Sequence, residues 1–202
     1  DSVINQTLKD IEIICVDAGS TDGTLEILRE YEKQDARVRV IVSEKKSYGY
    51  QMNLGIDEAK GEYIGIVETD DYVPSEMYEE LYKVAVENDV DFVKADFYRF
   101  VGEGESISKA HYKLAPASYY YNRVIDIVHE QETFCFTMNT WSGIYKKSFL
   151  VENNIRHNET PGASYQDNGF WFQTFMYAKR AYFVDKPYYM NRRDNDNSSV
   201  YS

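Results

Sequence analysis

The stretch IEIICVDAGSTD, residues 11–22, carries most of the information on fold class. It opens with an apolar run interrupted only by Glu12 and ends in a tight polar turn. A short apolar run rich in β-branched residues and bounded by turn residues is typical of a buried strand. Beyond the turn, Leu25, Leu28 and Tyr31 recur at the spacing of one helix face. The segment therefore predicts a strand, a turn and a helix, as in a βαβ unit.

The same alternation continues through the first half of the chain. Strands are expected at residues 38–42, 63–67 and 90–98, with helices around residues 52–59 and 74–84. Strands that alternate with helices in this way are typical of sheets whose strands run parallel. The sequence thus predicts an α/β fold with a mainly parallel central sheet.

The second half has a less regular pattern. Residues 101–118 are rich in Gly, Ser and Lys and are expected to form a connecting segment rather than core. Further elements are expected as a helix at 124–132, a strand or turn at 141–145, a helix at 167–179 and a final strand at 181–184, before Pro187.

The composition excludes several classes of protein. The 202 residues suffice for a substantial core. The net charge of −12 argues against a nucleic-acid partner, because such binding relies on clustered Lys and Arg. Only Cys15 and Cys135 are present, and Cys15 lies in the apolar run, which predicts no disulfide framework and a reducing, cytoplasmic compartment. The apolar runs are far shorter than the roughly 20 residues of a membrane helix.

Acidic side chains follow two of the predicted strands. Asp17 ends the first strand, and Glu68, Asp70 and Asp71 follow the strand at 63–67. In open α/β sheets, ligands bind beyond the carboxyl ends of the strands. Closely spaced carboxylates repel one another, and their oxygens suit Mg²⁺ or Mn²⁺, which commonly bridge to phosphates. The alternative interpretation is a solvated turn.

Asp17 and a further acid, Asp167, each have both a local and a functional interpretation. Asp17 either belongs to a strand-to-helix turn or faces a nucleobase or ribose. Asp167 stands at the start of a predicted helix, where an Asp is first of all a cap. As a functional group it would be a carboxylate base near an acceptor hydroxyl, with Trp171 lining a sugar site. The sequence has neither a Gly-x-Ser-x-Gly elbow nor a Walker-type loop, which disfavours hydrolases and P-loop proteins.

With these residues assembled, the chain resembles the family 2 glycosyltransferases of bacterial surface polysaccharide synthesis, which share the GT-A fold. The likeness is carried by residues 2–7 with 11–24, by ETDD at 68–71 and by YQD at 165–167. Residues 141–150 and the tail 187–199 also look familial. Members of the family begin with a strand that carries a Pro-x-Tyr-Asn-like turn. This sequence begins after that strand in the family pattern, so the strand is expected to precede residue 1.

The resemblance implies roles for individual residues. Asp17 matches the acid that contacts the nucleoside. Asp70 and Asp71 match the residues that hold the metal and the donor diphosphate or ribose. Asp167 matches the catalytic base, and Arg192 matches a basic residue near the donor phosphates. The chain departs from the family pattern at three positions, which are Ala18, Glu68 and Gln166.

The resemblance also implies a reaction. The expected enzyme moves a sugar, with inversion, from a nucleoside diphosphate sugar such as a UDP-sugar to a glycan or lipid-linked acceptor. Mn²⁺ or Mg²⁺ is the expected cofactor. Residues 1–100 are expected to form the donor-binding half, and residues 101–202 the acceptor-binding and catalytic-base half of the same domain. A homodimer and peripheral membrane association at the inner face of the cytoplasmic membrane, through segments outside this chain, are further expectations.

Two rival hypotheses stay open at this stage. The first is a catalytically silent domain that binds sugar nucleotides or carbohydrate, which Ala18, Gln166 and the missing first strand favour. The second is an acidic, doubly wound signalling domain whose acid cluster holds Mg²⁺ around a phosphoacceptor Asp. The second hypothesis leaves the helix that begins near Asp167 without a function.

Overall fold

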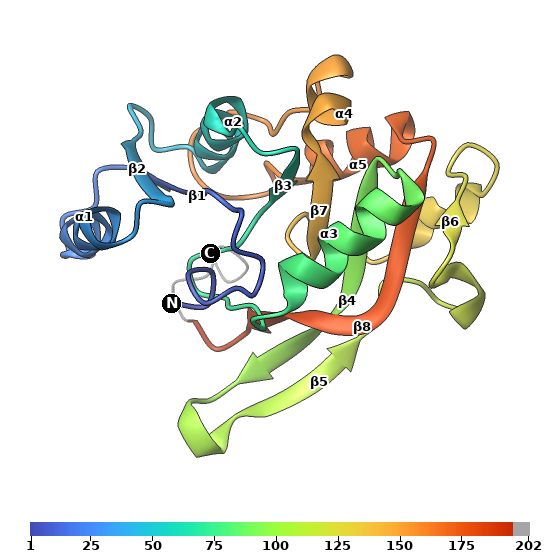
Figure 1. Ribbon diagram of the computed structural model, residues 1–202, viewed down its shortest axis with the longest axis horizontal. Helices are drawn as coiled ribbons and strands as arrows, with labels where there is room; N and C mark the ends of the chain where they lie inside the picture. The colour runs from blue at the N-terminus through green and yellow to red at the C-terminus, as the bar shows by residue number, and fades with distance from the viewer. Residues whose placement is uncertain (196–202) are drawn as a thin grey trace.

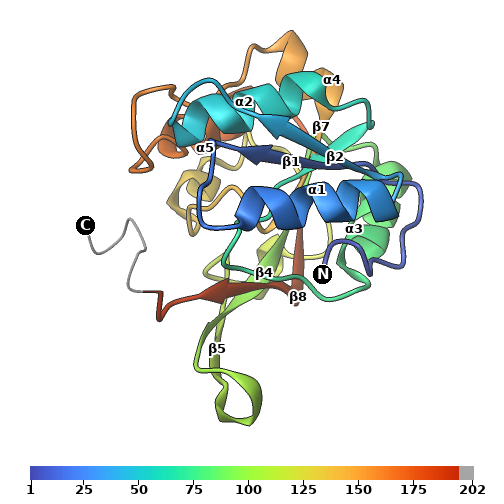
Figure 2. The ribbon, with the colours of Figure 1, turned by 90° about the vertical axis from the view of Figure 1, so that its left-hand side faces the viewer.

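The computed structural model describes residues 1–195 and has an α/β architecture (Figure 1). Its N-terminal part is a two-stranded parallel sheet of β1 and β2, flanked by two helices. Figure 2 shows α1 and α2 on opposite sides of these strands. The elements are β1 (Ile13–Asp17), α1 (Thr24–Gln34), β2 (Val38–Val42) and α2 (Tyr48–Glu58).

The larger sheet has the strand order β3-β7-β4-β8-β6, and β5 pairs with β4 outside this path. Parallel pairing, expected for the central sheet, joins β1 to β2 and β4 to β8, whereas the other pairs are antiparallel. The strands are β3 (Tyr63–Gly65), β4 (Phe92–Val101), β5 (Ser108–Tyr112), β6 (Val124–Ile125), β7 (Gly143–Lys146) and β8 (Ala181–Arg192).

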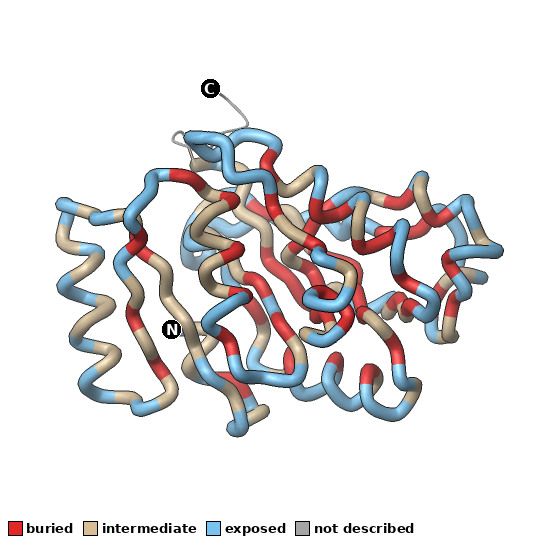
Figure 3. Tube along the Cα trace, turned by 90° about the horizontal axis from the view of Figure 1, so that it is seen from above, coloured by how far each residue is buried: buried red, intermediate tan, exposed pale blue. Residues whose placement is uncertain are grey.

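Helices cover this sheet and close one continuous core. α3 (Met77–Asn88) packs on β4, β7 and β8, and α4 (Lys147–Glu152) follows β7. From α5 (Asn168–Tyr177), Phe175 packs on Phe92 with ring centroids 5.2 Å apart. Figure 3 shows that buried residues concentrate in the larger sheet. The described helix α1, by contrast, contains no buried residue.

The helix expected at residues 124–132 is not formed, and that prediction was wrong. Val124–Ile125 is instead strand β6, paired with β8. Asp126 then accepts hydrogen bonds from the Val128 N–H and the His129 ring, at 3.1 and 2.7 Å. A side chain that bonds its own neighbouring backbone in this way favours a turn over a helix. A short 3₁₀ helix at Gln131–Cys135 follows.

Residues 101–118 are more than a connection, since they hold β5 and two buried residues, Leu114 and Ala115. The rings of Phe97 and Tyr112 stack across β4 and β5 at 5.6 Å, the kind of cross-strand pair that stabilises a hairpin. The final strand also continues past Pro187 to Arg192. Proline is tolerated there because it falls in the irregular register between the two ladders of β8 with β4.

Gly143 in β7 allows the close approach of β4. A Cβ at this position would lie 2.2 Å from the Val93 carbonyl oxygen and 2.9 Å from the Lys94 Cα. Gly143→Ala is therefore expected to lower the free energy of unfolding by about 2 kcal/mol, because backbone atoms must move apart. Urea unfolding followed by circular dichroism would measure this. The matched control Gly169→Ala, whose nearest neighbour is a side-chain atom at 3.7 Å, is expected to change stability little. Equal midpoints for both variants would contradict the prediction.

Candidate functional site

The acidic turn after β3 is anchored to β8. The Tyr72 N–H donates to the Met190 carbonyl at 3.2 Å, and the Met190 N–H donates back to Tyr72 at 2.9 Å. Within the turn, the Asp71 N–H donates to the Glu68 carbonyl at 3.2 Å. The backbone of the turn is therefore positioned by the strand that ends in Arg192.

Asp71 is the most firmly held carboxylate of the turn. Its Oδ1 accepts the Arg192 N–H at 2.7 Å, and its Oδ2 lies 3.2 Å from the Asn191 side-chain amide. Burial raises the pKa of Asp71, although these hydrogen bonds act in the opposite direction. Asp70, beside it, accepts from the Asn195 side chain at 3.0 Å. Asp71 thus ties the turn to β8, while Asp70 stands next to it on the same turn.

Glu68 is held from two sides. Its Oε1 accepts the Tyr48 hydroxyl at 2.6 Å, and its backbone N–H donates to the Tyr189 hydroxyl at 2.9 Å. Burial raises the pKa of Glu68 to about 7, and the neighbouring charges of Asp71, Asp70 and Asp167 act in the same direction. A cation beside this turn would favour the ionised carboxylates.

Asp167 lies at the N-cap position of α5, but its side chain makes no capping hydrogen bond among the described residues. The local interpretation of Asp167 as a cap is therefore not what the structure shows. Its charge raises the pKa of Tyr48 and Tyr145, after the larger effect of burial, and also acts on Glu68. Asp167 is thus near enough to the acidic turn for its charge to act on Glu68 and on Tyr48, the residue that donates a hydrogen bond to Glu68.

Asp17 ends β1 and is buried in its own turn. Its Oδ1 accepts the backbone N–H groups of Gly19 and Ser20, both at 2.8 Å, and its Oδ2 accepts the Ser20 hydroxyl at 2.5 Å. Desolvation alone would raise its pKa, but these hydrogen bonds outweigh it and lower the pKa. The turn interpretation is thus realised in the structure, and the contact with a nucleoside stays a prediction.

The Arg192 side chain pairs with two carboxylates outside the acidic turn, those of Glu103 and Asp194. Its Nη2 lies 2.9 Å from Glu103, and its Nε lies 2.8 Å from Asp194. A donor phosphate would therefore compete with two carboxylates for this guanidinium. Its backbone N–H is the part of Arg192 that contacts Asp71.

Several residues around the acidic turn were not predicted as site residues from the sequence. Tyr48 and Tyr189 hold Glu68, and the Trp141 ring stacks on Tyr189 at 4.4 Å. The loop that carries Trp141 is fixed by the buried Lys94, whose Nζ donates to the Asn139 carbonyl at 2.8 Å. The two tyrosines have no signal in the sequence beyond the abundance of Tyr, whereas Trp141 lies in the stretch 141–150 that resembles the family.

A metal ion is compatible with the acidic turn only if other ligands complete its coordination. No group of three or more His, Cys, Asp or Glu side chains in residues 1–195 is arranged to hold a metal ion. Asp71 already uses both oxygens toward β8. Mg²⁺ is commonly held by one or two carboxylates together with waters and substrate phosphates. The carboxylates of Asp70 and Asp71 fit that incomplete donor set.

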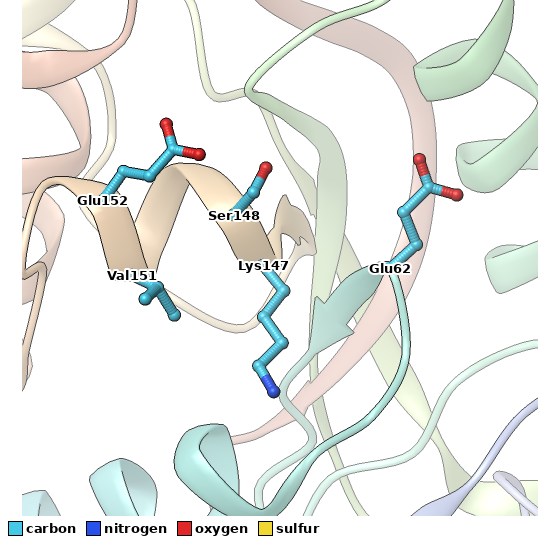
Figure 4. Close-up of a pocket in the computed structure, with 5 residues that line it drawn as sticks. All are labelled: Glu62, Lys147, Ser148, Val151 and Glu152. Atoms are coloured by element: carbon cyan, nitrogen blue, oxygen red, sulfur yellow. The ribbon is translucent and has the colours of Figure 1, made fainter.

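A hollow elsewhere on the surface is lined by Glu62, Lys147, Ser148, Val151 and Glu152 (Figure 4). Glu62 precedes β3, so this hollow lies at the opposite end of that strand from the acidic turn. None of the residues predicted as catalytic, donor-binding or metal-binding lines it. The described part of the chain also contains no helix with the length and apolarity that crossing a membrane requires.

Comparison with known proteins gives the chain a family. The model of "Glycosyl transferase family 2" matches residues 1–149. The uncharacterized glycosyltransferase EpsJ of Bacillus subtilis is 34% identical over 98% of this chain and 57% of its own length. A poly(ribitol-phosphate) beta-glucosyltransferase of Bacillus spizizenii is 34% identical over 99% of this chain and 31% of its own length. The chain thus spans about half, or less, of these relatives.

Solved structures agree in fold. S. aureus TarS, crystallised with UDP-GlcNAc, matches with a TM-score of 0.78 at 22% identity, over 100% of this chain and 55% of the TarS chain. A mannosyltransferase of Pyrobaculum calidifontis, in complex with GDP-Man and Mn²⁺, matches with a TM-score of 0.60 at 14% identity, over 98% of this chain and 52% of that one. The likeness confirms the predicted GT-A fold. The match over residues 1–149 and the 34% identity to EpsJ show that this chain belongs to glycosyl transferase family 2.

Proposed function

We propose that this chain carries the active site of a glycosyltransferase that moves a sugar from a UDP-sugar to a hydroxyl acceptor in cell-surface polysaccharide synthesis. The observation that carries the proposal is the Tyr48–Glu68 hydrogen bond in the acidic turn, together with the nearness of Asp167, whose charge acts on the pKa of both residues. A base and a diphosphate site must adjoin for such a transfer. UDP-GlcNAc bound to TarS supports UDP as the nucleotide. Family membership also disfavours the signalling-domain hypothesis.

In the proposed mechanism, Asp167 accepts the proton of the acceptor hydroxyl as that oxygen attacks the anomeric carbon. The bond between this carbon and the diphosphate oxygen breaks, and the nucleoside diphosphate leaves with the bonding electrons. The configuration at the anomeric carbon is inverted. Tyr48 keeps Glu68 in place beside this reaction through its hydroxyl.

Asp70 and Asp71 are the residues that would hold Mn²⁺ or Mg²⁺. When bound, such an ion neutralises negative charge on the departing diphosphate. In the same proposal, Asp17 contacts the nucleoside and Arg192 lies near the donor phosphates. To bind a donor phosphate, the Arg192 guanidinium would first have to leave Glu103 or Asp194.

The two halves of the chain have different roles in this proposal. Residues 1–100 bind the donor, and residues 101–202 supply the base and bind a glycan or lipid-linked acceptor. The poly(ribitol-phosphate) relative supports a surface polymer as acceptor. We place the reaction in the cytoplasm, at the inner face of the membrane, where lipid-linked acceptors are held. A homodimer stays a prediction.

Donor binding tests this function. Calorimetric titration with UDP and GDP, each with and without Mn²⁺, is expected to show binding of UDP that Mn²⁺ strengthens. Asp70→Asn removes a negatively charged ligand and is expected to weaken the Mn²⁺-dependent binding at least about tenfold. Asp126→Asn, a change on the exposed turn after β6, is the matched control and should bind as the wild type does. UDP binding that is absent, or is indifferent to both Mn²⁺ and Asp70, would contradict the proposal.

A further inference from the structure

The hairpin of β4 and β5 carries a guanidinium that pairs with no carboxylate of residues 1–195. Arg99 lies on β4, and Figures 1 and 2 show the hairpin of β4 and β5 extending from the body of the molecule. Within residues 1–195, Arg99 forms no ion pair, although the chain has 34 acidic residues against 22 basic ones. Ion pairs with carboxylates are instead formed by Arg29, Arg37, Arg39, Arg123, Arg156 and Arg192.

Aromatic rings hold this guanidinium in place. The Cζ of Arg99 lies 4.3 Å from the ring centroid of Tyr112 and 5.9 Å from that of Phe97. Its Nε is buried and has no hydrogen-bond partner among the described residues. Stacking on a ring occupies the face of a guanidinium and leaves the N–H donors at its edge available. Because the Nε is buried, a ligand would bind through the terminal Nη donors of Arg99, a cation that the rings hold in position.

The strand register places Arg99 beside the acidic turn. Arg99 pairs with Asn191 across β4 and β8, and Phe97 pairs with Tyr189. Paired residues point to the same face of a sheet, so these four side chains share one face. Asn191 is the residue that contacts Asp71, and Tyr189 is the residue that contacts Glu68. One strand therefore separates Arg99 from the proposed metal and donor site.

Aromatic side chains form a continuous cluster between the two places. The Trp141 ring stacks on Tyr189 at 4.4 Å and meets Phe97 edge-on at 4.8 Å. Phe97 in turn stacks on Tyr112 at 5.6 Å, and Tyr112 is 37% exposed. Phe97 and Tyr189 are buried, so only Trp141 and Tyr112 can offer a flat face to the apolar side of a sugar or polyol. The cluster thus links the acidic turn to the guanidinium and is open to a ligand at Trp141 and Tyr112.

We propose that Arg99 and Tyr112 form a binding position for a phosphate group, next to the donor site and to Trp141. Guanidinium binds phosphate oxygens through paired N–H donors, which makes phosphate the fitting ligand. In a chain of net charge −12, a guanidinium that pairs with no carboxylate of residues 1–195 is a local source of positive potential beside the acidic turn. The phosphate belongs either to the donor diphosphate or to a polyol-phosphate acceptor. This inference rests on the proposed function for the identity of both sources.

The test compares Arg99→Met with a matched control, Arg123→Met. Arg123 also stacks on a tyrosine, with its Cζ 4.1 Å from the ring centroid of Tyr119, but it pairs with Glu130. One arm titrates UDP and uridine in the presence of Mn²⁺. The other arm titrates glycerol 3-phosphate and glycerol at saturating UDP, or without UDP if UDP does not bind. Arg99→Lys, which keeps the charge but loses the paired donors, is expected to give a smaller loss than Arg99→Met, and circular dichroism checks that each variant is folded.

Arg99→Met is expected to weaken the binding of one phosphate ligand, UDP or glycerol 3-phosphate, about tenfold. The binding of the matching neutral ligand, uridine or glycerol, should not change, and Arg123→Met should bind all four ligands as the wild type does. A loss confined to UDP assigns the position to the donor diphosphate. A loss confined to glycerol 3-phosphate assigns it to the acceptor. Unchanged affinity in both arms overturns the inference while leaving the proposed function intact. Wild-type protein that binds no UDP contradicts the proposed function, and the glycerol 3-phosphate arm still decides whether Arg99 binds phosphate.

Discussion

Asp167→Asn is expected to lower the turnover number about 1,000-fold while the affinity for UDP stays within about twofold of the wild type. A carboxylate that removes a proton in the transition state contributes a factor of this order, and an amide cannot accept that proton. The residue stands at the start of α5 without a capping hydrogen bond among the described residues, so its replacement removes no helix cap. Release of UDP from UDP-GlcNAc, with cell-envelope fractions as the source of acceptor, measures turnover.

Two comparisons make the Asp167 result specific. Asp126→Asn, on the exposed turn after β6, should keep wild-type turnover. Calorimetry on Asp167→Asn separates lost chemistry from lost donor binding. Turnover retained in Asp167→Asn would show that this residue is not the base. A wild-type protein that binds UDP but never releases it from the donor, with any acceptor fraction, would favour the catalytically silent binding domain.

Lowering the pH from 7 to 4 is expected to reduce the free energy of unfolding of the wild type by about 3 kcal/mol more than that of His157→Phe. The imidazole of His157 is 3% exposed and stacks on Phe170 with centroids 4.2 Å apart. Neither ring nitrogen has a hydrogen-bond partner among the described residues. Burial lowers the pKa of His157 from its ordinary value of 6.5 to about 3.

The sign follows from the protons that each state binds. Between pH 3 and 6.5 the unfolded chain carries a proton on His157 that the folded chain excludes. This contribution to stability is complete above pH 6.5 and is lost as the pH falls toward 3. Urea unfolding of both proteins at a series of pH values measures the difference. His129→Gln, at an exposed histidine, should follow the wild type, and the same acid loss in His157→Phe would refute the assignment to His157.

Local patterns in the sequence were sufficient for the regular part of the fold. The helix stripes around Leu28, Ile56 and Leu81 correspond to α1, α2 and α3. The helix prediction for residues 124–132 was wrong because the apolar residues of this segment fit a helix and a strand equally well. Pairing with β8 stabilises the strand. The extension of β8 past Pro187 likewise depends on β4, whose irregular register accommodates the proline.

The candidate site divides in the same way. Asp17, the ETDD turn and Asp167 can be located from the sequence, because strand ends and helix starts carry short-range signals. The contact of Tyr48 with Glu68 joins residues 20 positions apart, and that of Asn191 with Asp71 joins residues 120 positions apart. No local pattern encodes such contacts, since they arise from the register of strands and the packing of helices. Motifs and strand positions thus predict which carboxylates belong to the candidate site. Only the folded sheet determines that Asp71 faces β8 and that Arg99 lies beside Asn191.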